Sequence, residues 1–237
     1  MAWSDIRARI RSQLADDGSL RWTDADLERY YNQGVDLQHQ LVFRKSKVFE
    51  ERLPFRSYEN DYLRLFLKVQ TGTFTPGVQD YSLPADFWRL ARVTVSLSPP
   101  VQADPVHWNE DWDVRNLPQR APMPTRPKYA LVPVSAATYK VRFYVAPGYK
   151  TVPNSTDSYA IYYYRKPIQV ASTASPPVDS ELPDPFNEAP VHWACFQALM
   201  KFHIDGAPYR QAFDSTVDLI VEGASPEVTG SAGEGGS

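Results

Sequence analysis

Hydrophobic residues recur every three or four positions near both ends of the chain, and this spacing predicts amphipathic helices. The first predicted helix has apolar residues four positions apart: Ile6, Ile10 and Leu14. Ser4 precedes this stripe and is its predicted N-cap, and Gly18 is predicted to end the helix. Because an apolar stripe needs a partner to cover it, we expect this helix to pack against the next one as a hairpin.

The second predicted helix spans about residues 24–43 and begins with a capping-box pattern, in which Thr23 is followed three positions later by Asp26. Its stripe has the spacing three, four, three, four: Leu27, Tyr30, Gly34, Leu37 and Leu41. A glycine inside a helix costs about 1 kcal/mol relative to alanine. We therefore expect a neighbouring backbone to approach closely at Gly34.

A second pair of helices is predicted near the C-terminus. Pro190 suits the first turn of the earlier helix, which is predicted to end at Asp205 and Gly206. Its stripe is Val191, Cys195, Ala198, Leu199 and Phe202. Pro208 opens the later helix, whose apolar face is Tyr209, Phe213, Thr216 or Val217, and Ile220. From Ala224 onward small and polar residues dominate, so we expect a tail that is mobile in the free protein.

Between these helical segments the apolar pattern changes to period two, which predicts strands. The predicted strands are residues 62–69, 89–97, 128–133, 138–146 and 159–164. The short links favour antiparallel pairing, because a parallel crossover needs roughly a dozen residues or more. The chain holds 21 prolines, and their density in this region leaves room for a short helix only between Pro105 and Pro118.

These patterns together predict an α+β fold. The helices from the two termini are expected to form one helical bundle, because in that arrangement the four apolar stripes cover one another. An antiparallel β-rich domain, either a sheet or a sandwich, is inserted between them. The predicted boundaries are residues 1–50 and 178–223 for the helical bundle domain, 51–177 for the inserted domain and 224–237 for a flexible C-terminal tail.

Composition places the chain among globular proteins. With 237 residues, of which 43% are hydrophobic, it has enough apolar side chains for a substantial core. The formal net charge of -3 gives no overall basic field, so tight sequence-independent binding of nucleic acid is not expected. The single cysteine, Cys195, excludes an internal disulfide. Because neither a secretory signal nor a run of roughly 20 apolar residues is found, we expect a soluble protein made in the cytoplasm, with no membrane partner.

The sequence lacks the motifs that mark common active sites. It has no glycine-rich phosphate loop, no His-Glu-x-x-His pattern, no Cys-x-x-Cys pair and no Gly-x-Ser-x-Gly elbow. His192 and Cys195 have the spacing of metal ligands on one helical turn, but zinc needs further ligands and Cys195 already fits the apolar stripe. We therefore predict no catalytic residue, no metal, no cofactor and no enzymatic activity.

The densest group of aromatic and acidic side chains is found at residues 107–113. Aromatic rings stack on sugars, and paired carboxylates divide acid and base work in glycoside hydrolysis. A carbohydrate-binding or carbohydrate-cleaving module that uses residues 108–113 is therefore one hypothesis. The interpretation that we favour is a single helical turn, in which Trp108 and Trp112 anchor the segment and the carboxylates stay in water.

Basic residues and a tyrosine run raise a nucleic-acid-binding accessory protein as another hypothesis. The basic residues near the N-terminus are Arg7, Arg9, Arg11, Arg44, Lys45 and Lys47. Acidic neighbours and the negative net charge favour ordinary solvated helix charges instead. Tyr162, Tyr163 and Tyr164 would suit base stacking, but alternation along a strand explains them more simply as core and sheet-surface residues.

Taken in order along the chain, several short segments resemble the head-to-tail adaptor, or connector, proteins of tailed bacteriophages. The segments that carry the resemblance are residues 22–27, 31–32, 81–87, 127–129, 163–167 and 182–183. The resemblance spans roughly residues 1–221, and it rests on the order of the segments along the chain.

The resemblance implies a structural virion protein of the head-tail junction that performs no chemistry. Members of the family form a ring, commonly of twelve copies, beneath the portal protein. The ring extends the DNA channel, through which double-stranded DNA passes, and offers a platform to the tail, nozzle or tail-terminator protein. A helical bundle forms the ring wall, flexible termini reach the portal, and a β-rich insertion projects toward other virion parts.

Six residues are candidates for a partner interface: Arg7, Arg11, Trp108, Trp112, Ala224 and Val228. They come from the first helix, the tryptophan segment and the C-terminal tail. The sequence thus leaves three hypotheses, of which a ring-forming virion adaptor ranks first, ahead of the carbohydrate module and the nucleic-acid-binding protein.

Overall fold

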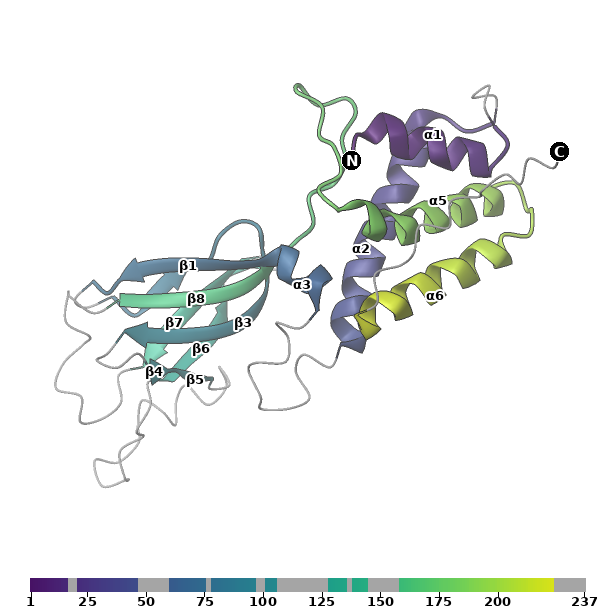
Figure 1. The fold of residues 1–237 in the computed structure, drawn as a ribbon. Helices are drawn as coiled ribbons and strands as arrows, with labels where there is room; N and C mark the ends of the chain where they lie inside the picture. Colours follow the sequence, from purple (N-terminus) through teal and green to yellow (C-terminus); the bar gives the residue numbers. More distant parts are fainter. Residues whose placement is uncertain are drawn as a thin grey trace. The chain divides into compact units, whose positions relative to one another are not determined.

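The computed structural model of the protein describes residues 1–16, 21–46, 60–75, 78–96, 101–105, 128–135, 138–144 and 158–223. The chain forms two compact units, which we call the helical unit (Met1–Leu65 with Pro167–Ser237) and the β unit (Phe66–Lys166). Helices lie near both ends of the chain, and paired strands lie between them in the sequence (Figure 1). The predicted α+β class is confirmed.

Helices from the two ends of the chain pack together in the helical unit. The helical elements are α1 (Trp3–Gln13), α2 (Asp24–Lys45), α3 (Asp61–Phe66), the 3-10 helix η3 (Asp184–Asn187), α5 (Glu188–Met200) and α6 (Ala207–Glu222). Helix α5 packs against both α2 and α6, and α1 contacts α2 and α5 (Figure 1). The expected bundle and the expected contact between the first two helices are both present.

Helix α2 begins at the predicted cap. The hydroxyl of Thr23 accepts a hydrogen bond from the backbone N–H of Asp26 at 3.1 Å and donates one to the Asp26 carboxylate at 2.9 Å. This pairing satisfies one N–H group that the first helical turn leaves without a partner. Arg44 and Lys45 lie in the last turn, where cations interact favourably with the negative end of the helix dipole.

Gly34 lies where α2 meets α5, as its position in the stripe predicts. A Cβ atom at this position would lie 2.9 Å from the Cα of Pro190 and 3.0 Å from the Cβ of Trp193. Pro190 itself occupies the first turn of α5, also as predicted. The two backbones therefore approach more closely than any side chain at residue 34 would allow.

Three predicted helix ends are wrong. Helix α1 ends at Gln13, before the predicted end at Gly18, and Ala15 just after it has a left-handed backbone (φ 50°). Helix α1 begins at Trp3, whose backbone N–H donates to the carboxylate of Asp179 at 2.9 Å, so a side chain distant in sequence replaces Ser4 as the cap. Helix α5 ends at Met200, because His203 has a left-handed backbone (φ 57°) and Ile204 N–H bonds to the carbonyl of Leu199 at 3.1 Å. This pattern closes a helix before Asp205 is reached.

The predicted strand at residues 62–69 is partly wrong, because its first half is helix α3. The side-chain oxygen of Asn60 accepts a hydrogen bond from Leu63 N–H at 3.1 Å, and the Asn60 amide donates to the carbonyl of Ile220 at 2.9 Å. Tyr62, Leu63 and Phe66 are buried, and their spacing places them on one side of a helix, whereas on a strand Leu63 would face away from the other two. Strand pairing begins only at Leu67.

The described residues of the β unit form two sheets. Its strands are β1 (Leu67–Thr73), β2 (Asp80–Ser82), β3 (Phe87–Ser96), β4 (Val101–Gln102), β5 (Asp104–Pro105), β6 (Lys128–Pro133), β7 (Tyr139–Tyr144) and β8 (Ser158–Arg165). One sheet has the order β1-β8-β3-β4 and the other β2-β7-β6-β5. The pairs are antiparallel except for the short pair of β5 with β6, which is parallel. The predicted strand at residues 89–97 corresponds to β3, which begins at Phe87.

Both sheets contribute side chains to one core, so the β unit is a sandwich (Figure 1). The buried residues are Phe74, Val93, Val95, Ala103, Tyr129, Val141, Phe143, Tyr159 and Ile161. Aromatic rings dominate the centre, where Phe74 and Phe143 meet edge to face with ring centroids 5.0 Å apart. Such contacts add to the free energy gained by burying the rings.

Candidate partner interface

Arg11 joins α1 to the start of α2. Its side chain is only 8% exposed and donates to the Asp16 carboxylate at 2.8 Å, to the Asp24 carboxylate at 2.6 Å and to the carbonyl of Trp22 at 3.0 Å. Arg7 bonds to the same Asp24 carboxylate. The hydrogen bond from Arg11, with the charge of Arg7, holds the pKa of Asp24 below its ordinary value. Arg7 is therefore the more accessible of these two predicted interface residues.

The other predicted interface residues lie outside the described residues. Trp108 and Trp112 belong to the undescribed residues 106–127, and Ala224 and Val228 belong to the undescribed residues 224–237. The short helix expected between Pro105 and Pro118 falls in the same gap. These assignments stay predictions.

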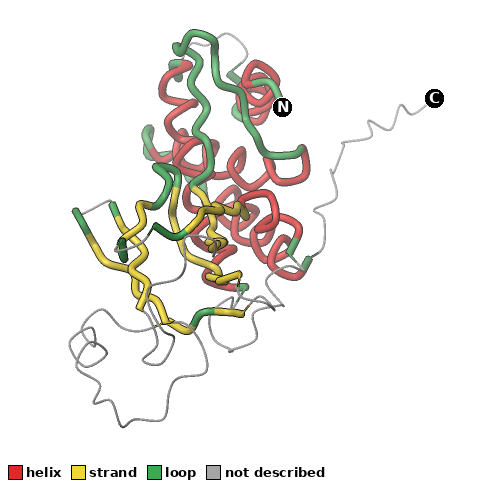
Figure 2. Tube along the Cα trace, turned by 90° about the vertical axis from the view of Figure 1, so that its left-hand side faces the viewer, coloured by secondary structure: helices red, strands yellow, loops and turns green. Residues whose placement is uncertain are grey.

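A loop that we call the arm, residues 167–183, runs beside the helices of the helical unit and leads into η3 (Figure 2). Asn32 of α2 holds it through a pair of hydrogen bonds to one backbone position. The Asn32 amide donates to the carbonyl of Val170 at 2.8 Å, and Val170 N–H donates to the Asn32 side-chain oxygen at 2.9 Å. The side chain thereby pairs with the arm as a neighbouring strand would.

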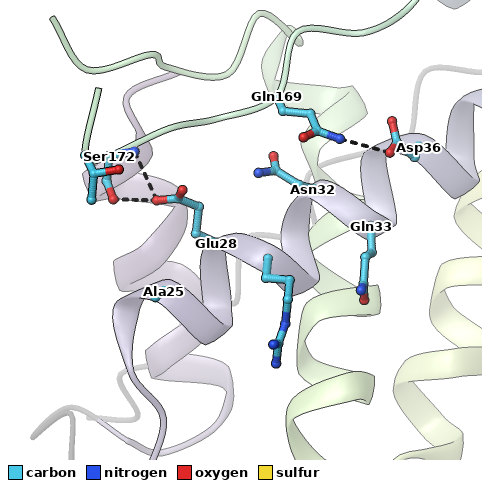
Figure 3. Close-up of a pocket in the computed structure, with 9 residues that line it drawn as sticks. Ala25, Glu28, Asn32, Gln33, Asp36, Gln169 and Ser172 are labelled. Carbon is cyan, nitrogen blue, oxygen red and sulfur yellow. Dashed lines mark hydrogen bonds between the residues drawn. The ribbon is translucent and has the colours of Figure 1, made fainter. Parts of the chain in front are cut away.

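Two carboxylates of α2 flank this contact, one turn before and one turn after Asn32 (Figure 3). The Glu28 carboxylate accepts hydrogen bonds from the backbone N–H and the hydroxyl of Ser172, the former at 3.0 Å. The Gln169 amide donates to the Asp36 carboxylate at 3.0 Å. Residues four positions apart share a helix face, so the three side chains form one row along the arm.

The far end of the arm is tied to buried side chains. The hydroxyl of Tyr31 contacts Ser180 at 2.9 Å and donates to the side-chain oxygen of Asn187, whose amide in turn donates to the carbonyl of Leu182 at 2.9 Å. Burial raises the pKa of Tyr31, so its hydroxyl remains protonated and able to donate. Both ends of the arm are therefore fixed to the helical unit.

A polar groove of about 380 Å³ lies between α2 and the arm. Its lining residues are Ala25, Glu28, Arg29, Asn32, Gln33, Asp36, Gln169, Ser172 and Thr173. The carboxylates that face it are already hydrogen-bonded to the arm (Figure 3). The arrangement suits positioning of the arm better than catalysis, which would need an acid or base left free to react.

Exposed apolar side chains gather at the turn between α5 and α6. Met200, Phe202 and Ile204 are each exposed by more than two fifths, although large apolar residues favour burial. The ring of Phe202 packs edge to face against Trp22, with centroids 5.6 Å apart. Sequence reasoning assigned Phe202 to a buried stripe, because it could not foresee the left-handed turn that exposes it.

Cys195 is buried in α5, as its place in the apolar stripe predicts. Its thiol lies 3.3 Å from the side-chain oxygen of Gln13, and burial raises the thiol pKa to about 12. Burial, together with the nearby charge of Arg9, lowers the pKa of His192. A protonated thiol is a poor nucleophile and a poor metal ligand, which fits a packing role for Cys195.

Two absences within the described residues bear on other site classes. Within those residues no cluster of three or more His, Cys, Asp or Glu side chains is arranged to hold a metal ion. The described helices include none whose length and apolar character would let it cross a membrane.

The row on α2 that holds the arm was not found from the sequence. Glu28, Asn32 and Asp36 lie outside the apolar stripe that the sequence predicts for this helix. Their regular spacing was the available signal, but the partner lies more than 130 residues away in sequence.

Comparison with known proteins identifies the family. The model of a family described as SU10 adaptor protein matches residues 1–232, which is nearly the whole chain. No curated protein sequence matches the chain. The resemblance expected from the order of the short segments is therefore confirmed. The chain belongs to the SU10 adaptor protein family, a family of phage head-tail adaptors with a structural role in the virion.

Proposed function

We propose that this adaptor assembles as a ring, of about twelve copies as in the families it resembles, between the portal and the tail, and that the ring extends the DNA channel. The family match over residues 1–232 carries this proposal. The packing of helices from both ends of the chain in the helical unit supports it, because a stiff bundle suits the wall of a ring. The net charge of -3 suits a channel that DNA passes without binding.

The proposed partners follow from this position. The portal protein lies on one side of the ring, and a tail, nozzle or tail-terminator protein lies on the other. Residues 224–237 would order against the portal, at an entropic cost that the new contacts must exceed. Arg7, Arg11, Trp108, Trp112, Ala224 and Val228 remain the proposed interface residues. Arg11 would contribute by positioning Asp24, since Arg11 itself is buried.

We also propose separate domains, with a bundle domain of residues 1–50 and 178–223 and an inserted domain of residues 51–177. The division into compact units at Leu65 and Lys166 supports the general arrangement. In this proposal the protein is made in the host cytoplasm, acts without enzymatic chemistry and resides at the head-tail junction of the virion.

Electron cryomicroscopy of the native virion tests the proposal. We expect density for this chain as a closed ring around the channel, directly beneath the portal. A location on the fibres or the capsid surface, or an open arrangement that does not surround the channel, would contradict it.

A binding titration with duplex DNA at two salt concentrations tests the passive channel. We expect weak binding at both concentrations. Tight binding that falls steeply as salt rises would instead indicate neutralised phosphates and a nucleic-acid-binding protein.

A further inference from the structure

One row of side chains crosses the sheet that contains β1, β8 and β3. Val69 on β1 and Arg92 on β3 are both register partners of Tyr162 on β8, so the three side chains lie on one face. Val93 and Ile161, the next residues on their strands, are fully buried on the opposite face. The row is therefore on the outer face of the sandwich, and Val69 is 53% exposed.

Arg92 in this row has no carboxylate partner among the described residues. Its guanidinium carbon lies 4.4 Å from the centroid of the Tyr162 ring, and its Nε atom is buried without a hydrogen-bond acceptor. The three strands contain no acidic residue, and their basic residues are Lys68, Arg89, Arg92 and Arg165. A partly buried cation without an anion costs free energy, so Arg92 is placed to meet an anion from outside.

The last turn of α6 has the opposite charge at its surface. Glu222 is exposed and has no ion pair within the described part of the chain, and the last turn of α6 contains no basic residue. A carboxylate at a helix C-terminus is repelled by the negative end of the helix dipole. Leu219, three positions earlier on the same face, is 40% exposed. Glu222 is therefore placed to meet a cation, with an exposed aliphatic side chain beside it.

We propose that these two surfaces bind each other between neighbouring copies of the chain. In this contact Glu222 of one copy pairs with Arg92 of the next, and Leu219 packs on Val69 and Tyr162. The inference rests on the proposed ring and names the contact that builds it. Because the two surfaces differ, the contact is head-to-tail, and such contacts close into a ring when the rotation between copies divides a full circle.

A second copy explains both surfaces at once. A DNA phosphate would satisfy Arg92, but it would leave Val69 exposed and would not account for Glu222 and Leu219 on α6. An acidic segment of another virion protein would account for the sheet and leave α6 unexplained. A contact between copies pairs the two isolated charges and covers both aliphatic side chains, which is the combination that specific interfaces use.

Disulfide trapping tests the contact, because Cys195 is the only cysteine and is buried. Val69→Cys and Leu219→Cys are introduced into separate full-length chains, particles are assembled from an equal mixture, and the particles are oxidised. We expect disulfide-linked dimers from the mixture and none from either variant alone. Dimers formed by Val69→Cys alone, or no dimers in the mixture, overturn the proposal.

Exchange of charges is the second test, read as the amount of adaptor in purified particles. We expect Arg92→Glu and Glu222→Arg each to reduce incorporation about tenfold, and the double variant to regain it to within about twofold. Lys68→Glu, a charge reversal on the same sheet outside the row, should leave incorporation unchanged. Since Glu222 is exposed, Glu222→Arg should leave folding intact, which circular dichroism checks.

The outcomes separate this inference from the proposed function. Normal incorporation of both single variants, or failure of the double variant to recover, overturns the contact even where microscopy shows a ring. A native virion without any ring overturns the proposed function as well.

Discussion

The helical unit and the β unit are stabilised by different kinds of contact. In the helical unit, buried polar side chains connect segments far apart in sequence, as Asn60 does with the carbonyl of Ile220 and Tyr31 with Asn187. In the β unit, backbone pairing and a cluster of aromatic rings fill that role, with Phe74 and Phe143 at the centre. Both units bury apolar side chains, and the helical unit adds directional bonds between distant segments.

The difference matters for an adaptor. Directional bonds have narrow ranges of distance and angle, so they hold α1, α2 and the arm in one geometry. Apolar burial is non-directional and scales with area, so it gives the β unit stability without specifying single contacts so closely. Four changes would break or sharpen this contrast.

The largest effect is expected in the aromatic core. Phe143→Ala should lower the free energy of unfolding of the β unit by about 3–5 kcal/mol, because it removes a buried ring and leaves a cavity. Chemical denaturation followed by tyrosine and tryptophan fluorescence measures the change. Tyr139→Ala, at a partly exposed position on the same strand, is the control and should cost much less. Equal losses from the two variants would mean that the cluster is not the main source of stability.

The next effect tests the directional bonds. Arg11→Met should lower the stability of the helical unit by about 2–3 kcal/mol, because the buried Asp16 carboxylate loses the guanidinium charge of Arg11. Thermal unfolding by calorimetry measures the change. Arg29→Met removes an exposed ion pair with Asp26 and should cost under about 1 kcal/mol. Equal losses of stability from the two arginine variants would mean that burial does not strengthen the Arg11 ion pair.

A smaller effect is expected where α2 meets α5. Gly34→Ala gains helix propensity but places a Cβ atom against the Pro190 backbone, for a net loss of about 1–2 kcal/mol. Alkylation of Cys195 under native conditions offers a local readout, because the thiol reacts only when the helices open. Gln40→Ala, on an exposed position of α2, should leave the rate unchanged. We expect Gly34→Ala to speed alkylation of Cys195. Slower alkylation than in the unchanged protein would show that the contact accommodates the added methyl group without strain.

The smallest effect concerns the stability of the helical unit at acidic pH. Hydrogen bonds from Arg11 and Lys201 hold the pKa values of Asp24 and Asp26 below the ordinary 3.8. The stabilisation from such depressed carboxylates is complete above pH 3.8 and is lost as the pH falls through their folded-state values. Asp24→Asn should therefore flatten the fall in stability of the helical unit below that pH, measured by denaturation at a series of pH values. An unchanged slope would falsify this assignment.

Features decided by local pattern could be predicted from the sequence. The capping box at Thr23, the close approach at Gly34 and the position of Pro190 each depend on neighbours within a few residues or on a steric requirement of a single residue. The family could be recognised because the order of short segments is itself a property of the sequence.

Features that depend on distant partners could not be predicted. The sequence predicts a strand where helix α3 forms, and the cap of α3, Asn60, is tied to Ile220, which is 160 positions away. The cap of α1 is Asp179, which no local pattern indicates. Only folding brings such groups together, so a one-dimensional pattern leaves their pairing open.

The sequence by itself determined the helical and strand periods, the α+β class and the membership of an adaptor family, because these depend on spacing and order along the chain. The tertiary structure alone decided that Asn32 holds the arm and that Arg92 and Glu222 lack charge partners within the described part of one copy. The physical reason is that hydrogen bonds and ion pairs act over a few ångströms in space, whatever the separation of the residues in the chain.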